Sequence, residues 1–155
     1  MKIAIVKLSA IGDIIHSMIV LQFIKEKYPE SIIDWFVDTS LKGVLENNPH
    51  VSKIHTIRLR EAKKKKSPIL FFNEIAKLRK LKKYDLVIDM QNLIKSAIIA
   101  QLIPSIQTIG LDMKSSREGL ASIFYTQKYA IDRSINVINR NVEIICKALG
   151  IKVSE

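Results

Sequence analysis

Short apolar runs alternate with segments of helical periodicity along the whole chain. Most of the runs are apolar throughout instead of alternating with polar residues, a pattern typical of strands buried on both faces of a parallel sheet. The pattern predicts strands at residues 2–6, 31–38, 53–59, 84–90 and 106–111, and a short last strand at 128–131.

Helical periodicity fills the segments between these strands. Pro29, Pro104 and Gly150 mark helix ends, and Pro68 suits a first helical turn. The pattern predicts helices at residues 12–28, 40–49, 68–83, 93–103, 117–125 and 134–149. The alternation predicts an α/β, Rossmann-like fold with a mostly parallel sheet and helices on both faces. We expect one domain over residues 1–155, since no repeat or linker interrupts the pattern.

The composition agrees with a globular protein and adds a strong positive charge. The 155 residues are 48% apolar and 26% charged, and 25 basic against 15 acidic side chains give a net charge of +10. Such an excess favours a polyanionic partner, such as nucleic acid, an anionic membrane surface, or a phosphorylated or carboxylated substrate. An Ile- and Lys-rich composition also produces this excess without any partner, so the sum of charges leaves both interpretations open.

The cysteine and histidine content and the hydropathy of the chain indicate which sites and which location the protein has. Cys146 is the single cysteine, so the chain has no internal disulfide, which suits a reducing cytoplasm. The histidines His16, His50 and His55 lie apart without metal-ligand spacing, and we expect neither a metal nor a cofactor. The sequence shows no secretion signal and no run of about 18 apolar residues, which predicts a cytosolic or peripheral protein.

The candidate site follows from the predicted sheet, because ligands of parallel α/β sheets bind beyond the carboxyl ends of the strands. The segments that follow these ends begin at residues 9, 38, 58, 90 and 111. The first of them contains only Gly12, so it lacks both the G-x-G-x-x-G dinucleotide fingerprint and the P-loop.

Asp13 stands at the start of an otherwise apolar helix, in KLSAIGDIIHSM. In one interpretation Ser9 caps this helix and the Asp13 carboxylate interacts with the helix dipole. In the other, Asp13 is a general base that faces the cleft and takes a proton from a substrate hydroxyl. The spacing alone does not decide between them.

Three segments, VKLSAIGDIIHSM, YDLVIDMQNLIKSA and SREGLASIFY, resemble in this order the lipopolysaccharide heptosyltransferase I branch of glycosyltransferase family 9. Enzymes of that branch add the first heptose to Kdo-lipid A in Gram-negative bacteria. The resemblance implies the N-terminal, acceptor-binding half of a GT-B fold, whose C-terminal domain binds the donor ADP-heptose and is absent from this chain. We therefore expect the chain alone to have negligible transferase activity, and the enzyme to contact the cytoplasmic face of the inner membrane.

The resemblance also assigns roles to residues of the first turn. Asp13 falls on the family's proposed catalytic base, which deprotonates the Kdo hydroxyl for a single inverting displacement, and Ser9, Ala10 and Gly12 would shape its turn. Asn92 stands where family members often carry glycine, and asparagine tolerates left-handed backbone geometry better than most residues.

A basic stretch, RLREAKKKKSP, follows the third strand at residues 58–68. As a clamp for Kdo carboxylates and lipid A phosphates it would use Arg58, Arg60, Lys63 and Lys64, with Lys65 and Lys66 toward the membrane surface. The alternative is a solvated charged face without a ligand.

Further candidate acceptor-binding residues lie later in the chain. Gln91 and Lys95 follow the fourth strand, Arg117 matches a family position, and Arg140 lies on the last helix. Acidic neighbours offer a purely structural alternative for the two arginines: Asp112 or Glu118 for the first and Glu143 for the second.

The sequence leaves two alternative functions open. One is a basic Rossmann-like module that binds nucleic acid or a membrane without catalysis, and the other is heptosyltransferase II. The sequence contains no helix-turn-helix, zinc ligands or aromatic stacking platform, so we expect no nucleic acid partner.

Overall fold

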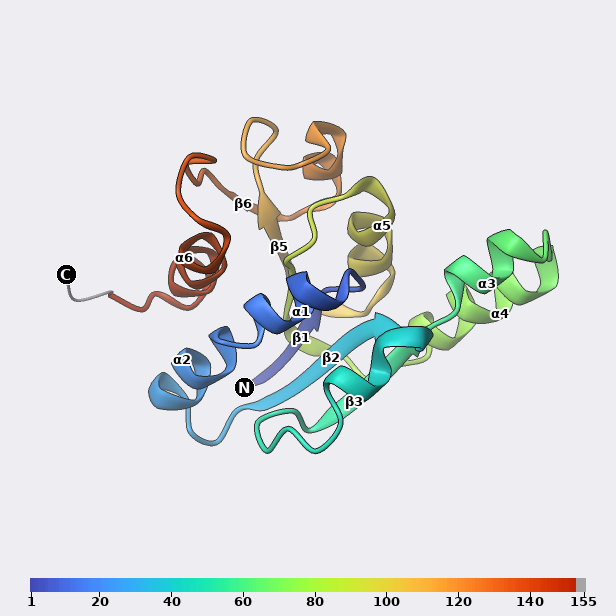
Figure 1. Cartoon of the computed structure of the whole chain (residues 1–155), viewed down its shortest axis with the longest axis horizontal. Helices are drawn as coiled ribbons and strands as arrows, with labels where there is room; N and C mark the ends of the chain where they lie inside the picture. The colour runs from blue at the N-terminus through green and yellow to red at the C-terminus, as the bar shows by residue number, and fades with distance from the viewer. Residues whose placement is uncertain (153–155) are drawn as a thin grey trace.

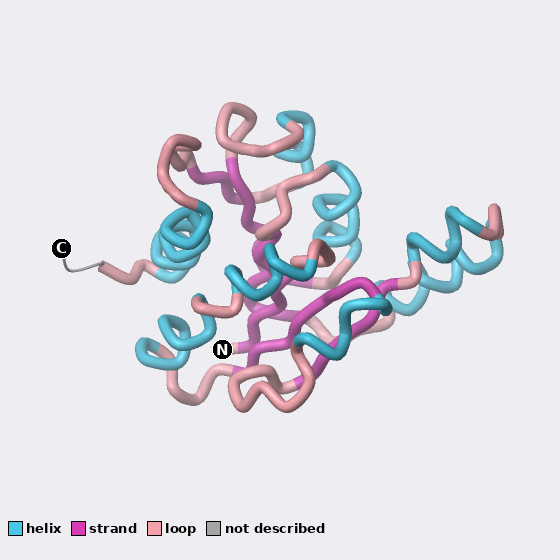
Figure 2. The backbone as a smooth tube through the Cα atoms, viewed as in Figure 1, coloured by secondary structure: helices cyan, strands magenta, loops and turns pink. Residues whose placement is uncertain are grey.

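A single six-stranded sheet organises the protein. The computed structural model describes residues 1–152, and every neighbouring pair of strands in it is parallel, in the order β3-β2-β1-β4-β5-β6 (Figure 1, Figure 2). The strands are β1 (Lys2–Val6), β2 (Ile32–Asp38), β3 (Lys53–Ile57), β4 (Tyr84–Asp89), β5 (Ser105–Leu111) and β6 (Gln127–Tyr129). The predicted α/β, Rossmann-like fold class is confirmed.

Helices connect the strands. The α-helices are α1 (Ile11–Ser17), α2 (Val20–Lys27), α3 (Leu59–Lys64), α4 (Pro68–Arg79), α5 (Ile94–Leu102) and α6 (Val137–Leu149), and the 3-10 helices are η1 (Thr39–Val44) and η2 (Gly119–Phe124). Helix α4 begins at Pro68 and α6 ends before Gly150, as the sequence predicts, and local capping sets both ends. Ser67 accepts a hydrogen bond from the backbone of Leu70 ahead of Pro68, and Gly150 ends α6 with a left-handed φ of 65°.

The two faces of the sheet carry separate hydrophobic cores, because successive side chains of a strand point to opposite faces. Ile3 and Ile5 of β1 pack into the core under α1, α2 and α6, and their neighbours Ala4 and Val6 pack into the core under α4 and α5. All four are fully buried. The continuous apolar runs of the sequence are therefore explained by burial on both faces.

The structure corrects several predicted boundaries. The helix predicted at 12–28 is two helices separated at residues 18–19, where the sequence has neither glycine nor proline. Within α1 the hydroxyl of Ser17 donates to the carbonyl of Asp13 at 2.7 Å, a side-chain bond that weakens and bends a helix. The segments predicted as helices at 40–49 and 117–125 contain only short 3-10 turns, and the helix predicted at 68–83 ends at Arg79.

A helical hairpin is the largest departure from the expected elements. Strand β3 ends at Ile57, and the basic stretch after it forms helix α3, which packs against α4. The pair projects away from the sheet (Figure 1). Its base is anchored by the buried Glu74, which accepts from the backbone of Arg58 at 3.0 Å and pairs with Lys77 at 3.0 Å.

Candidate functional site

The turn between β1 and α1 separates two cavities at the carboxyl edge of the sheet. Leu8 and Ser9 line a large cleft of about 690 Å³, and Asp13 lines a small pocket of about 130 Å³. Ala10, rather than Ser9, is the N-cap of α1, and its alanine side chain cannot cap. The Asp13 carboxylate instead accepts from the Ala10 backbone nitrogen at 3.4 Å, a long bond that leaves most of its acceptor capacity free.

Three cations converge on the Asp13 pocket from three different parts of the chain. Lys7 follows β1, Arg117 precedes η2, and Arg140 lies on α6. Burial lowers the pKa of the Lys7 ammonium, the positive charges of Arg117 and Arg140 add to this effect, and Asp13 and Asp89 oppose it. The pocket therefore holds one carboxylate beside an excess of positive charge, an arrangement that suits an anionic ligand.

Within residues 1–152 the acidic residues near Arg117 and Arg140 in the sequence form no ion pairs with them. Glu143 pairs with Lys147 at 3.0 Å, and the Nε of Arg140 is buried without a hydrogen-bond partner among residues 1–152. Within the same residues Arg117 forms no ion pair with Glu118, whose carboxylate accepts from the backbone of Ile94 at 3.2 Å. Asp112 accepts from Ser115 instead. Both guanidinium groups are thus available to a ligand.

Gln91 and Asn92 hold the two sides of the pocket in place. The Gln91 carboxamide oxygen accepts from the backbone nitrogens of Leu8 at 2.7 Å and Ser9 at 3.2 Å. Asn92 has a left-handed φ of 55°, and its side-chain oxygen accepts from the Leu111 nitrogen at 3.0 Å. Its own carbonyl accepts from the Glu118 nitrogen at 3.2 Å, which fixes the segment that carries Arg117.

The buried carboxylate of Asp89 fixes this loop. It accepts from the backbone nitrogens of Gln91 and Asn92 at 2.9 and 3.1 Å, and from the hydroxyls of Ser96 at 2.9 Å and Tyr125 at 2.6 Å. Burial raises the pKa of Asp89, and these hydrogen bonds oppose the rise. The Asp89 side chain therefore stabilises the loop, and because it is buried it does not contact a ligand.

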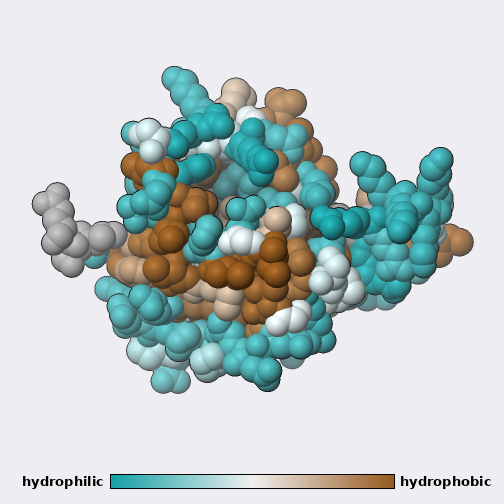
Figure 3. Space-filling model, in the orientation of Figure 1, coloured by the Kyte–Doolittle hydropathy of each residue, from teal (hydrophilic) through white to brown (hydrophobic). Residues whose placement is uncertain are grey.

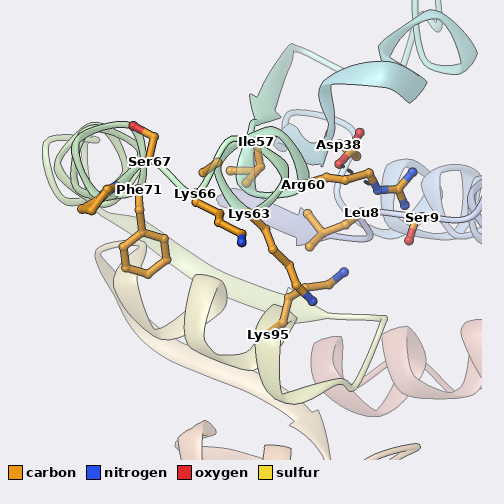
Figure 4. Close-up of a pocket in the computed structure, with 12 residues that line it drawn as sticks. Leu8, Ser9, Asp38, Ile57, Arg60, Lys63, Lys66, Ser67, Phe71 and Lys95 are labelled. Atoms are coloured by element: carbon orange, nitrogen blue, oxygen red, sulfur yellow. Dashed lines mark ion pairs between the residues drawn. The ribbon is translucent and has the colours of Figure 1, made fainter.

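The large cleft is lined by both apolar side chains and cations, which come from several elements (Figure 4). Leu8, Ile57 and Phe71 supply apolar surface, and the cations are Arg60, Lys63, Lys66 and Lys95. Arg60 is 66% exposed, and its ion pair with the Asp38 carboxylate is long, at 4.0 Å, so most of its guanidinium group faces solvent.

The predicted anion clamp is therefore divided. Arg58 and Lys64 line a second cavity of about 360 Å³ and not the large cleft, whereas Arg60 lines both cavities. Arg58 makes two hydrogen bonds with Glu61, at 2.8 and 3.0 Å, and Lys65 makes another at 2.8 Å. Hydrogen bonds from Arg58 and Lys65 lower the pKa of Glu61 to about 2, so Glu61 stays charged and satisfies both.

The remaining predicted residues have simple positions. Ala10 is exposed at the N-cap of α1 and Gly12 is exposed within the first turn of that helix, and a Cβ added at Gly12 would meet no atom within 4 Å, so space does not demand glycine there. Sequence reasoning missed Lys7, although it directly follows the first strand in the segment where ligands of such sheets bind. It also missed Lys66 and Phe71 as cleft residues, because their positions depend on the unpredicted hairpin.

The fold and the site define an α/β domain with a cationic cleft at the carboxyl edge of a parallel sheet. Residues 74–155 match the family described as glycosyltransferase family 9 (heptosyltransferase). The chain belongs to this family.

Several proteins of known name are similar to the chain. Lipopolysaccharide heptosyltransferase 1 of Campylobacter coli is 41% identical over 140 residues, which are 90% of this chain and 39% of that protein. The protein of the same name from Escherichia coli K12 is 29% identical and matches 97% of this chain and 48% of its own length. The chain thus spans less than half of the length of these relatives.

Solved structures agree with this assignment. The E. coli heptosyltransferase WaaC with ADP has a TM-score of 0.90 and 29% identity, covering 98% of this chain and 48% of that one. The same enzyme with ADP-2-deoxy-2-fluoro heptose gives the same TM-score. E. coli ADP-heptose lps heptosyltransferase II, at 21% identity and a TM-score of 0.67, is similar in fold alone.

Proposed function

We propose that the complete enzyme transfers L-glycero-D-manno-heptose from ADP-heptose to the Kdo of Kdo-lipid A, with inversion at the anomeric carbon. The relatives of highest identity named above are lipopolysaccharide heptosyltransferases 1, and WaaC structures are described with ADP and with a fluorinated ADP-heptose. The observation that carries the proposal is the Asp13 carboxylate in a pocket with Lys7, Arg117 and Arg140, beside the large cleft.

In the proposed reaction Asp13 accepts the proton of the attacking Kdo hydroxyl. That oxygen forms a bond to the anomeric carbon while the bond from this carbon to the ADP oxygen breaks, and ADP leaves with the bonding electrons. Arg117 and Arg140 would bind the Kdo carboxylate, since guanidinium groups suit carboxylates, and would keep the nearby hydroxyl within reach of Asp13. Lys7 would add positive charge to the pocket.

Residues 1–155 would form the acceptor-binding domain, with ADP-heptose bound by a second domain. The large cleft would take the anionic saccharide of the acceptor, with Arg60, Lys63, Lys66 and Lys95 at its phosphates and carboxylates. Because the acceptor carries lipid chains, the enzyme would act at the cytoplasmic face of the inner membrane. Among the described residues no helix has the length and hydropathy of a membrane span.

Titration of the chain with a delipidated Kdo-containing acceptor, followed by NMR, tests the acceptor assignment. We expect shifts at Asp13, Arg117 and Arg140 and at the cleft cations, and no heptose transfer when ADP-heptose is added to the isolated chain. The absence of shifts at millimolar acceptor would contradict an acceptor site preformed in this domain. Detectable transfer by the chain alone would contradict a donor site in a second domain.

A further inference from the structure

The outer end of the α3–α4 hairpin combines exposed apolar side chains with exposed cations. Ile69 and Phe72 on α4 are 74% and 65% exposed. The four successive lysines 63–66 precede them and are all exposed. In space-filling view the hairpin is largely hydrophilic, with hydrophobic surface at its outer margin (Figure 3). Exposed apolar side chains beside a lysine cluster suit a binding partner whose surface is both apolar and anionic.

The hairpin tip is built to hold this arrangement. Lys66 takes a left-handed φ of 49°, Ser67 caps α4, and Pro68 begins that helix. Backbone bonds from Lys66 to Lys63 at 3.2 Å and from Ser67 to Ala62 at 3.1 Å close the turn. Together with the Glu74 anchor at the base, these contacts present Ile69 and Phe72 on a preformed element.

We propose that Ile69 and Phe72 insert into the interfacial region of an anionic bilayer while Lys64 and Lys65 contact its headgroups. The proposal rests on the proposed function in one respect, that a lipid-linked acceptor brings this domain to a membrane. Aromatic and aliphatic side chains gain by entering the boundary between headgroups and acyl chains, and lysines gain by lying near anionic lipid.

A bilayer fits this surface better than a protein partner does. Lysine is depleted at protein interfaces, since an ammonium group there loses its hydration. At a bilayer the lysine stems lie along the apolar boundary and the ammonium groups stay among the headgroups. Lys64 has no ion pair within residues 1–152, and Lys65 has only an exposed pair with Glu61, so both ammonium groups lie within reach of lipid headgroups.

Insertion would also place the large cleft at the membrane surface. Phe71, next to Phe72 on α4, lines that cleft together with Lys63 and Lys66 (Figure 4). The rings of Phe71 and Phe72 contact edge to face, with centroids 6.1 Å apart. The cleft therefore opens beside the inserting side chains, where the saccharide of a lipid anchored in the same bilayer could enter it.

Sedimentation of the protein with vesicles of phosphatidylethanolamine and phosphatidylglycerol, without any Kdo lipid, tests the proposal. We expect binding to these vesicles, little binding to neutral phosphatidylcholine, and a loss of about tenfold or more for the double variant Ile69→Ser/Phe72→Ser. Ile106→Ser is the matched control, because Ile106 is 63% exposed at the opposite end of the sheet. Equal binding by the double variant and the parent, or an equal loss in the control, would overturn the proposal.

A tryptophan at the tip reports insertion directly. Phe72→Trp should be quenched by lipids brominated on their acyl chains, whereas Ile106→Trp should not, and the native Trp35 is fully buried in the core of both. Absence of quenching at position 72 would overturn insertion. The vesicles contain no acceptor, so lipid binding and acceptor binding are measured independently. A protein that binds the delipidated acceptor but not the vesicles refutes this proposal alone. A protein that binds the vesicles but not the acceptor refutes the proposed function alone.

Discussion

The carboxamide oxygen of Gln91 lies 2.7 Å from the backbone nitrogen of Leu8, a contact between residues 83 positions apart. The same oxygen accepts from Ser9 at 3.2 Å, so the β4–α5 loop holds the turn that presents Asp13. Gln91 was predicted to bind the acceptor. Gln91 lines the Asp13 pocket and its oxygen is engaged by the turn, so we propose that it also positions this turn.

Gln91→Leu should leave the Leu8 and Ser9 nitrogens without their acceptor. An unsatisfied buried donor costs about 1–3 kcal/mol, so we expect the free energy of unfolding to fall by that order and the turnover of the complete enzyme to fall with it. Gln91→Glu is the matched control, because it keeps an acceptor oxygen and should retain most of the stability. Urea unfolding and steady-state kinetics measure both. A Leu variant as stable and active as the parent would contradict the assignment.

Asp13→Asn should separate the two interpretations of this carboxylate in the complete enzyme. As a general base, Asp13 should contribute about 100- to 10,000-fold to turnover, with little change in the acceptor KM. As a first-turn carboxylate alone, its loss should cost only about 0.3–1 kcal/mol of stability and leave turnover intact. Asp132→Asn is the control, since Asp132 is exposed and outside the pocket. Equal turnover of both variants would reject the base.

Arg140→Gln and Arg117→Gln should each weaken binding of a delipidated Kdo acceptor by about tenfold or more, because a hydrogen bond from a charged donor to a carboxylate is lost. Arg133→Gln is the control, an exposed arginine of the same chain that lines none of these cavities. NMR titration or calorimetry gives the affinities. If the control weakens binding as much as the two site variants, the effect is one of overall charge.

Arg60→Gln and Arg58→Gln should behave differently although the residues are two positions apart. Arg60 lines both the large cleft and the smaller cavity, whereas Arg58 lines only the smaller one, and its Nε and Nη2 donate to Glu61. We expect the first substitution to weaken acceptor binding several-fold and the second to change it little. The opposite order in the same titration would contradict acceptor binding in the large cleft.

The buried contacts of Asp34 predict an acid-sensitive contribution to stability. Burial alone would raise the pKa of Asp34, but hydrogen bonds from His55 and from Tyr84, at 3.1 and 2.5 Å, hold it below its ordinary value. A carboxyl group with a lowered pKa stabilises the fold above its unfolded-state pKa of about 3.9, and that stability is lost as the pH falls further.

Tyr84→Phe should therefore lower the free energy of unfolding by about 1–2 kcal/mol at pH 7, and by progressively less below about pH 4. Tyr129→Phe, a half-buried tyrosine of β6, is the control. Urea unfolding across this pH range measures the difference. A loss that is independent of pH would show that the Tyr84 hydroxyl does not act through the Asp34 carboxylate.

Local sequence determined the strands, several helix ends and the edge at which the site lies. The fully apolar runs require burial on both faces, and Ser67-Pro68 and Gly150 act on their own backbone, so these features need no distant partner. The turn with Asp13 and the cations after β3 were also found, because residues that follow parallel strands gather at one edge of the sheet.

Only the tertiary structure decided which of these residues meet. The pocket brings together Lys7, Arg117 and Arg140, and the pairing of Glu143 with Lys147 leaves Arg140 free. That Arg60 reaches the large cleft and Arg58 does not depends on helix α3, whose lysine-rich sequence has the pattern of a solvated segment. Periodicity describes burial along one element, whereas these relationships depend on the distance between elements, which the packing of the two cores sets.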